Sequence, residues 1–265
     1  MSKDPYAQLK ASQRQAWGLF APLEAVTTIP AAELVKHARV RPHQRVLDVG
    51  CGTGVAALTA ARAAAKVSGL DLSPVLIELA KKNARVAGVD IDFREGDVEA
   101  LPYGDASFDV VLSQFGHMFA PRAEVALAEM LRVLRPGGTI AFSTWPPEHF
   151  VGQMFALVGK HVPPPQGVSS PPQWGDTNVV RQRLGDAVTD IFFDRGVMTF
   201  PALSPQHYRK GIEETLGPVA KFVASLQGES LKLAAFRSEF DDLVGRYLEG
   251  NALRQQFLMT RATKR

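Results

Sequence analysis

The sequence predicts an α/β fold in which helices alternate with the strands of a mostly parallel sheet. Short apolar runs that suit buried strands recur through residues 45–144, and helical patterns separate them. The first run ends in a turn that contains three glycines, and such a turn permits a sharp step from a strand into a helix. Strands and helices that alternate at this spacing indicate parallel βαβ units.

Five strands are expected in this region: residues 45–50, 66–71, 91–95, 108–113 and 139–144. The segment 108–113 is apolar on both faces, which predicts a central strand. Pro74 stands near the start of one intervening helix, where the missing N–H of proline costs nothing, and Gly88 ends that helix. Two further strands are predicted near the C-terminus, at 190–200 and 256–262.

The whole chain, residues 1–265, is interpreted as a single domain with additions around this core. Its expected parts are N-terminal helices in 1–44, a cofactor-binding core in 45–148, and insertions in 149–189 and 201–250. Prolines interrupt the N-terminal segment, so several short helices are expected there instead of one. The two insertions are predicted to form a helical cap over the carboxyl edge of the sheet.

The charge balance is mildly basic, with 30 Lys and Arg residues against 27 Asp and Glu residues, a net charge of +3 and a pI near 9.0. A nucleic-acid binder usually carries a clustered basic stripe, which this sequence lacks, so no nucleic-acid partner is expected. The single cysteine, Cys51, excludes a disulfide framework and a multi-cysteine metal cluster. No pair of histidines has metal-ligand spacing, so no metal site is expected.

Membrane and export signals are not expected either. No uninterrupted apolar stretch approaches the roughly 18–20 residues that are needed to span a bilayer. The first residues lack the hydrophobic segment of a signal peptide. We therefore expect a cytoplasmic protein without a membrane partner, and the sequence leaves its oligomeric state open.

The turn Asp48-Val-Gly50-Cys-Gly52-Thr-Gly54 is the clearest candidate for a ligand site. Ligands of open α/β sheets bind outside the carboxyl ends of the strands, and a helix N-terminus beyond the turn favours an anionic group. Two ligand classes compete. A relaxed dinucleotide pattern runs from Gly52 to Ala57, with Asp71 nineteen residues after Gly52. An acid-x-G-x-G-x-G pattern that begins at Asp48 fits the turn better.

The segment Val46-Leu-Asp-Val-Gly-Cys-Gly-Thr-Gly resembles the first motif of class I S-adenosylmethionine-dependent methyltransferases. More narrowly, the chain is similar to the small-molecule group typified by ubiquinone and menaquinone C-methyltransferases. The companion motifs follow in order: Gly69-Leu-Asp-Leu-Ser, Glu95-Gly-Asp-Val-Glu, Ser107-Phe-Asp-Val-Val and Leu134-Arg-Pro-Gly-Gly. The resemblance implies a Rossmann-like seven-stranded sheet, mostly parallel with the last strand antiparallel, with helices on both faces and a helical cap.

The resemblance also implies S-adenosyl-L-methionine as the cofactor and a set of residues that bind it. The implied contacts are Gly50, Gly52 and Gly54 with the methionine portion, Asp48 and the Ser113 carbonyl with its ammonium, Asp71 with the ribose hydroxyls, and Leu72, Asp97 and Val98 with the adenine. The cofactor carries a net charge of about +1, so a site ringed with acidic residues suits it electrostatically.

Methyl transfer from a sulfonium is an in-line displacement, and holding donor and acceptor in near-attack geometry supplies much of the rate. A general base is needed only when the acceptor must lose a proton. His117, after the fourth strand, is the best-placed candidate for that base, and His149 is the second. Cys51 is interpreted as a small filler of the turn, because no adjacent residue would lower the pKa of its thiol.

The expected methyl acceptor is a small, apolar or aromatic molecule. Large apolar residues that could form the walls of its pocket are Trp17, Phe20, Phe115, Met118, Trp145, Phe155 and Trp174. Three other functions remain open: a nicotinamide-dependent oxidoreductase, a non-catalytic S-adenosylmethionine-binding protein, and a nucleic-acid methyltransferase. The last would normally show a basic groove or an N-P-P-Y-like motif, and neither is present.

Overall fold

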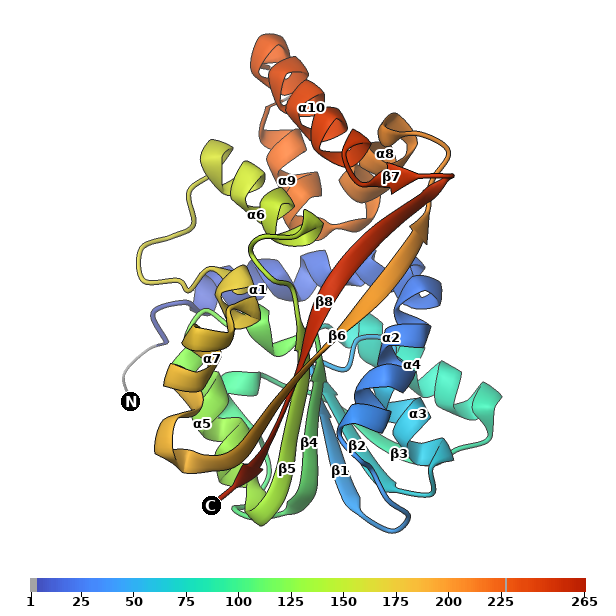
Figure 1. Ribbon diagram of the computed structural model, residues 1–265, viewed down its shortest axis with the longest axis vertical. Helices are drawn as coiled ribbons and strands as arrows, with labels where there is room; N and C mark the ends of the chain where they lie inside the picture. Colours follow the sequence, from blue (N-terminus) through green and yellow to red (C-terminus); the bar gives the residue numbers. More distant parts are fainter. Residues whose placement is uncertain (1–3, 227) are drawn as a thin grey trace.

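A single eight-stranded sheet organises the computed structural model, which describes residues 4–226 and 228–265 (Figure 1). The strand order is β3-β2-β1-β4-β5-β8-β6, and the short β7 pairs with β8. The strands are β1 (Arg45–Val49), β2 (Lys66–Asp71), β3 (Ile91–Glu95), β4 (Phe108–Gln114), β5 (Leu134–Thr144), β6 (Val188–Pro201), β7 (Leu248–Glu249) and β8 (Ala252–Lys264). The chain order reverses direction between β1 and β4, and this switch point is where ligands bind in such sheets.

The predicted fold class is confirmed. Strands β1 to β5 pair in parallel, and β8 runs antiparallel to both β5 and β6. All seven expected strands form, and the eighth is the two-residue β7. The sheet has a hydrophobic core on each face, and successive residues of its central strands point alternately into the two cores. Val46 and Val110 enter one core, whereas Leu47 and Val111 enter the other.

Helices cover both faces of the sheet. The helices are α1 (Ala7–Ala16), α2 (Glu24–His37), α3 (Val55–Arg62), α4 (Pro74–Ala87), α5 (Ala123–Val133), α6 (Phe150–His161), α7 (Thr177–Leu184), α8 (Pro205–Thr215), α9 (Gly217–Ser225) and α10 (Ser230–Gly245). Helices α2, α3 and α4 contribute to one core, and α5 contributes to the other. Short 3-10 segments connect them: η1 (Trp17–Leu23), η2 (Val98–Ala100), η3 (His117–Phe119), η4 (Pro171–Gly175) and η5 (Gly185–Ala187).

The cap consists of α6, α8, α9 and α10, which lie together above the carboxyl ends of the strands (Figure 1). Helix α7 lies elsewhere: it follows η4, packs against β6 and stands beside α5. The segment 149–189 therefore divides between the cap and the flank of the sheet. Residues 1–3 of the expected N-terminal segment and residue 227 of the second insertion lie outside the described residues.

The N-terminal helices contain the one stretch of the described chain that is long and apolar enough to cross a membrane. This stretch, Ala7–His37, has a mean hydropathy of 1.2 in its most apolar window, and 33% of that window is buried in the fold. It is not one regular α-helix, because η1 separates α1 from α2 and Pro30 lies inside α2. Helix α2 packs against α3 and β6, so it belongs to the folded domain.

Gly54 is required by both its backbone angle and its neighbours. Its φ is +88°, and a Cβ there would lie 2.8 Å from Leu58 Cδ1 and 3.0 Å from Phe93 Cζ. Gly88 has a similar φ of +65°, but nothing lies within 4 Å of a Cβ at that position. Alanine substitutions at the two glycines therefore distinguish the energetic cost of a left-handed backbone from the cost of steric overlap.

We expect Gly54→Ala to lower the free energy of unfolding by about 2–4 kcal/mol, because strain and steric overlap add. Gly88→Ala should lower it by about 1–2 kcal/mol, from strain alone. Urea denaturation of both variants measures the difference. Equal losses would show that packing around Gly54 does not constrain the turn.

Candidate active site

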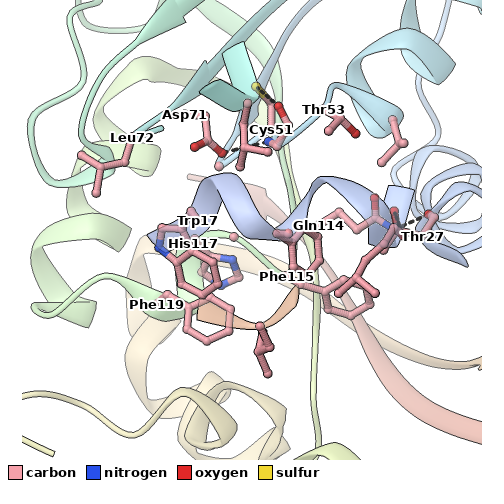
Figure 2. A pocket seen from close by; sticks show the side chains of 18 of the residues that line it. Trp17, Thr27, Cys51, Thr53, Asp71, Leu72, Gln114, Phe115, His117 and Phe119 are labelled. Carbon is pink, nitrogen blue, oxygen red and sulfur yellow. Dashed lines mark hydrogen bonds between the residues drawn. The ribbon is translucent and has the colours of Figure 1, made fainter. Parts of the chain in front are cut away.

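A large pocket lies at the carboxyl ends of the central strands, between the sheet and the cap. Its empty space, including the mouth, is about 1480 Å³. In Figure 2, Asp71 and Leu72 lie on one side of the pocket, and the rings of Trp17 and Phe119 lie across from them.

The glycine-rich turn between β1 and α3 forms one wall of this pocket. Gly50 and Gly52 line it, with φ values of +65° and +57°. A Cβ at Gly50 would lie 2.8 Å from the Cα of Gly116, so this turn and the loop after β4 approach each other closely. Gly54 does not line the pocket and instead faces the packing between α3, α4 and β3.

Asp71 ends β2 and ties this strand to the glycine turn. Its two carboxylate oxygens accept hydrogen bonds from the Gly52 N–H and the Ser73 N–H, both at 2.8 Å. Burial raises the pKa of Asp71, and these N–H donors partly offset that effect. The neighbouring Leu72 also lines the pocket. Asp71 therefore presents a held carboxylate at the end of β2.

Asp48 lies beneath the same turn and is 1% exposed. Its Oδ2 accepts from the Ala57 N–H at 2.9 Å, whereas its Oδ1 has no partner among the described residues. Burial raises the pKa of Asp48 to about 7, and the nearby charge of Asp71 contributes in the same direction. The site therefore holds two close carboxylates whose ionised forms need a compensating positive charge.

Asp97 is the third carboxylate of the pocket, after Asp48 and Asp71, and it lies beside the N-terminal helix α1. Its Oδ1 accepts from the Glu99 N–H at 2.9 Å, and its Oδ2 lies 2.7 Å from Lys10 Nζ. Lys10 also contacts Glu99 at 2.5 Å, and Arg122 Nε reaches the same Glu99 oxygen at 2.7 Å. Asp97, Val98 and Lys10 all line the pocket, so this network joins α1 to the sheet.

Three carboxylates of this network lie close enough together to hold a metal ion, but Lys10 contacts all of them. Carboxylate oxygens of Asp4, Asp97 and Glu99 lie within 4.8 Å of one another. Lys10 Nζ lies 2.5–2.7 Å from all three. The ammonium therefore already supplies the positive charge at this point.

Ser113 and Gln114 end β4 next to the glycine turn. Ser113 Oγ donates to the Val49 carbonyl at 2.6 Å and accepts from the His117 N–H at 3.0 Å. Its side chain is fully buried behind the pocket and does not line it. Gln114 does line the pocket: its Nε2 donates to the Thr27 carbonyl, and its Oε1 has no partner in the described chain.

His117 lies at the pocket but is 1% exposed, between the rings of Phe142 and Trp174 at centroid distances of 4.6 and 4.7 Å. Neither ring nitrogen has a hydrogen-bond partner among the described residues. Burial, with a contribution from the charge of Arg183, lowers the pKa of His117 to about 3. The imidazole is therefore neutral near pH 7, and its surroundings disfavour uptake of a proton.

Three other histidines and the cysteine stand apart from such chemistry. His149 Nε2 lies 2.8 Å from Arg195 Nη1, His161 packs against aromatic rings of the cap, and the His207 N–H donates to Ser204, which caps α8. None of these three lines the pocket in the described chain. Cys51 lines it, but burial and the nearby acidic groups raise the pKa of its thiol well above its usual value, so it is a poor nucleophile.

Aromatic and aliphatic side chains form the rest of the pocket. Five of the expected wall residues line it: Trp17, Phe20, Phe115, Trp145 and Phe155. Phe115 has a positive φ of 60°, and its ring stacks on Trp145 at 4.1 Å. The predictions for Met118 and Trp174 were wrong. Both are 0% exposed and belong to the core, because the loop after β4 turns Met118 inward and Trp174 packs behind His117.

Seven polar residues of the pocket were not predicted from the sequence: Lys10, Gln13, Thr27, Thr53, Gln114, Tyr208 and Gln255. Lys10 carries no local signal, since its partner Glu99 lies 89 residues further along the chain. Gln255 could have been found, because it interrupts the alternating apolar pattern between Leu253 and Phe257 in β8.

Comparison with known proteins agrees with this geometry. A methyltransferase domain family matches residues 47–142. An uncharacterised protein of Mycobacterium tuberculosis is 32% identical over 265 residues, which cover 97% of this chain and 96% of that protein. The demethylmenaquinone methyltransferase of Deinococcus radiodurans is 40% identical over 138 residues, covering 51% of this chain and 56% of that protein. The chain belongs to the S-adenosylmethionine-dependent methyltransferases.

A solved structure shares the fold of this methyltransferase. It is phosphoethanolamine N-methyltransferase 2 of Haemonchus contortus, in complex with S-adenosylhomocysteine, with a TM-score of 0.60 and 16% identity. The match covers 97% of this chain and 59% of that one. The cofactor of this methyltransferase is S-adenosylmethionine, and the nicotinamide-dependent alternative finds no support in these matches.

The residues of this methyltransferase fit that cofactor. Asp48 has a buried oxygen without a partner among the described residues, and a cationic ligand would satisfy it. Gly50 and Gly52 both line the pocket, and at Gly52 nothing lies within 4 Å of the position that a Cβ would take, so the turn leaves open space there. All predicted cofactor-binding residues except Gly54 and Ser113 line this pocket, and so does His117.

The low pKa of His117 makes stability depend on pH. Below about pH 6.5 the unfolded chain takes up a proton at this imidazole, whereas the folded protein does so only near pH 3. Stability is therefore lost as the pH falls between these values. Asp48 acts in the opposite direction, because its raised pKa favours the folded state as the pH falls from 7 towards 4.

We expect the His117→Gln variant to lack the acid-dependent loss that His117 causes. Between pH 7 and pH 5, the wild type should lose about 2 kcal/mol more of its free energy of unfolding than the variant. Urea denaturation across this range measures the difference, with His43→Gln on the exposed surface as the matched control. Identical pH profiles for His117→Gln and the wild type would contradict a buried, neutral imidazole.

Proposed function

We propose that this methyltransferase transfers a methyl group from S-adenosylmethionine to a small, apolar or aromatic acceptor. The segregation of charge within the pocket carries the proposal. The charged side chains among the described lining residues are Lys10, Asp48, Asp71 and Asp97, and all four lie at the cofactor end. The remainder is aromatic and aliphatic with a few neutral polar groups, so it would leave a charged acceptor uncompensated.

The cofactor end has a carboxylate for the ammonium group, for the ribose and for the adenine of S-adenosylmethionine. In this proposal Asp48 faces the ammonium group, and the backbone of Gly50 and Gly52 borders the methionine portion. Asp71 accepts hydrogen bonds from the ribose hydroxyls. Its position is supported by the two N–H donors that hold its carboxylate.

The adenine would lie between Leu72 and Val98. Asp97 keeps capacity to accept from the adenine amino group, because a carboxylate offers about four lone-pair sites and two protein donors occupy only part of them. Lys10 holds Asp97 in place from α1. Gly54 and Ser113 would act indirectly, since both support the turn from behind the pocket.

The chain's own residues would promote the reaction mainly by positioning. S-Adenosylmethionine supplies an electrophilic methyl group when it is bound. The rings of Phe115, Trp145 and Phe155 exclude water and orient a planar acceptor beside the turn. Neutral His117 can accept a hydrogen bond from a hydroxyl group of the methyl-acceptor molecule. Its low pKa makes it a weak general base.

The name of the Deinococcus relative supports an acceptor with a quinone-type ring. That protein is a demethylmenaquinone methyltransferase, and its match extends over about half of this chain. A bicyclic hydroquinone is planar and uncharged, and the aromatic walls of this pocket suit such a molecule. Transfer of labelled methyl groups to 1,4-naphthohydroquinone, and not to phosphoethanolamine, would support the proposal. Transfer to the charged amine alone would contradict it.

We expect Asp71→Asn to weaken binding of S-adenosylhomocysteine by about 1–3 kcal/mol, because hydrogen bonds to a charged acceptor are lost. Isothermal titration of the variant measures this change. Asp92→Asn is the matched control, since Asp92 lies on neighbouring β3 and pairs with Arg94 at the exposed surface. Wild-type affinity in Asp71→Asn would overturn the assignment of Asp71 to the ribose.

A further inference from the structure

The far wall of the pocket is a two-stranded ribbon that extends beyond the sheet. β5 pairs with only the second half of β8, from Leu258 to Thr263, whereas β6 stays paired with β8 back to Ala252. The first half of β8 therefore projects past the carboxyl end of β5. Its inward positions are Leu253, Gln255 and Phe257, which are 0%, 3% and 0% exposed.

Gln255 is a polar residue at a position where the strand pattern calls for an apolar one. Its Nε2 lies 2.9 Å from the Oη of Tyr208, which projects from cap helix α8. Tyr208 is 3% exposed, and rings of the cap and ribbon surround it: Phe150, Phe200 and Phe240. The two polar groups thus meet inside an otherwise apolar region.

This part of the pocket contains no other polar side chain among the described lining residues. From α6 onward the lining residues are Val151, Met154, Phe155, Met198, Phe200, Tyr208, Ile212, Leu216 and Gln255. The burial of Tyr208 raises the pKa of its phenol, so it stays protonated and can donate. A phenylalanine and a methionine would fill the same space without burying polar atoms.

The pair keeps an unused donor in either orientation of the amide. When the Gln255 nitrogen donates to Tyr208, the phenol O–H has no acceptor among the described residues. When the amide is turned, the phenol donates to the Gln255 oxygen, and the amide N–H groups are then left over. A buried donor without an acceptor is unfavourable, and an oxygen atom of a ligand would satisfy it.

The pair also lies away from the cofactor turn. In the strand order, β4 and β5 lie between β8 and β1, and Gln255 lies in the part of β8 that projects past the carboxyl end of β5. An oxygen bound by the pair therefore belongs to the acceptor molecule and not to the cofactor. It also differs from the atom that receives the methyl group, which must lie beside the turn.

We propose that Tyr208 and Gln255 form the specificity-determining contact for the methyl acceptor, by donating a hydrogen bond to a carbonyl or ether oxygen at the end of the molecule remote from the methylated atom. This inference rests on the proposed function, because it takes the apolar half of the pocket as the acceptor site. It narrows the acceptor class to apolar molecules that carry such an oxygen.

The test compares two probes that differ in one carbonyl group: 1-tetralone and tetralin. Their affinities are measured by titration in the presence of S-adenosylhomocysteine, for the wild type and for the double variant Tyr208→Phe with Gln255→Met. Replacing both partners by apolar groups of similar shape is close to neutral for stability. Tyr247→Phe is the matched control, because this cap tyrosine also bonds to a glutamine amide, that of Gln153, and packs on Phe150 without lining the pocket.

We expect the ratio of tetralone to tetralin affinity to fall about fivefold in the double variant, the scale of one hydrogen bond, and to stay unchanged in Tyr247→Phe. An unchanged ratio in the double variant, or binding of neither probe to the wild type, overturns the inference. Binding of S-adenosylhomocysteine is measured separately. If the wild type does not bind it, this result counts against the proposed function and not against the Tyr208–Gln255 contact.

A second measurement on the wild type guards against misfolding of the double variant. The infrared carbonyl stretch of bound, ¹³C-labelled 1-tetralone should lie below its value in a hydrocarbon solvent, because hydrogen bonding weakens the C=O bond. A stretch at the hydrocarbon value overturns the inference. A lowered stretch that persists in a folded double variant overturns it as well.

Discussion

The burial of two carboxylates beneath the glycine-rich turn is the constraint on which the site depends. Asp48 and Asp71 accept hydrogen bonds from the N–H groups of Ala57 and Gly52, and these bonds hold the turn between β1 and α3. Burial raises the pKa of both acids, since few donors compensate their charge. The turn is therefore held together by carboxylates whose charge is not fully compensated, and we propose that the ammonium group of the bound ligand supplies the missing positive charge.

The pocket is divided into a charged cofactor end and an apolar half. Acidic groups and Lys10 gather at the ends of β1, β2 and β3, so the other half can remain apolar. Helix α1 connects the two regions: Lys10 contacts Asp97 at the cofactor end, and Trp17, in the segment that follows α1, packs against Phe119. The extended ribbon of β6 and β8 closes the far side, where Tyr208 and Gln255 provide the polar contact.

Local patterns in the sequence were enough to predict the sheet and the cofactor turn. Strand and helix signals act over a few residues, and the glycine spacing reflects backbone angles within one turn. Contacts between distant segments could not be predicted this way. The neutral state of His117 depends on Phe142 and Trp174, and the site of α7 depends on its packing against β6. Gln255 could be predicted in part: the sequence shows a polar residue at an inward position of a strand, but not its contact with Tyr208.

The most direct test of this account is the number of protons released when S-adenosylhomocysteine binds. Titration at pH 6.5, in two buffers that differ in ionisation enthalpy, measures it. Asp48, with a pKa of about 7, is mostly protonated at that pH and should ionise as the ligand's ammonium approaches. We expect release of up to about 0.8 proton per ligand bound, and almost none in Asp48→Asn. No release by the wild type, or the same release by both proteins, would contradict a site completed by the ammonium group of its ligand.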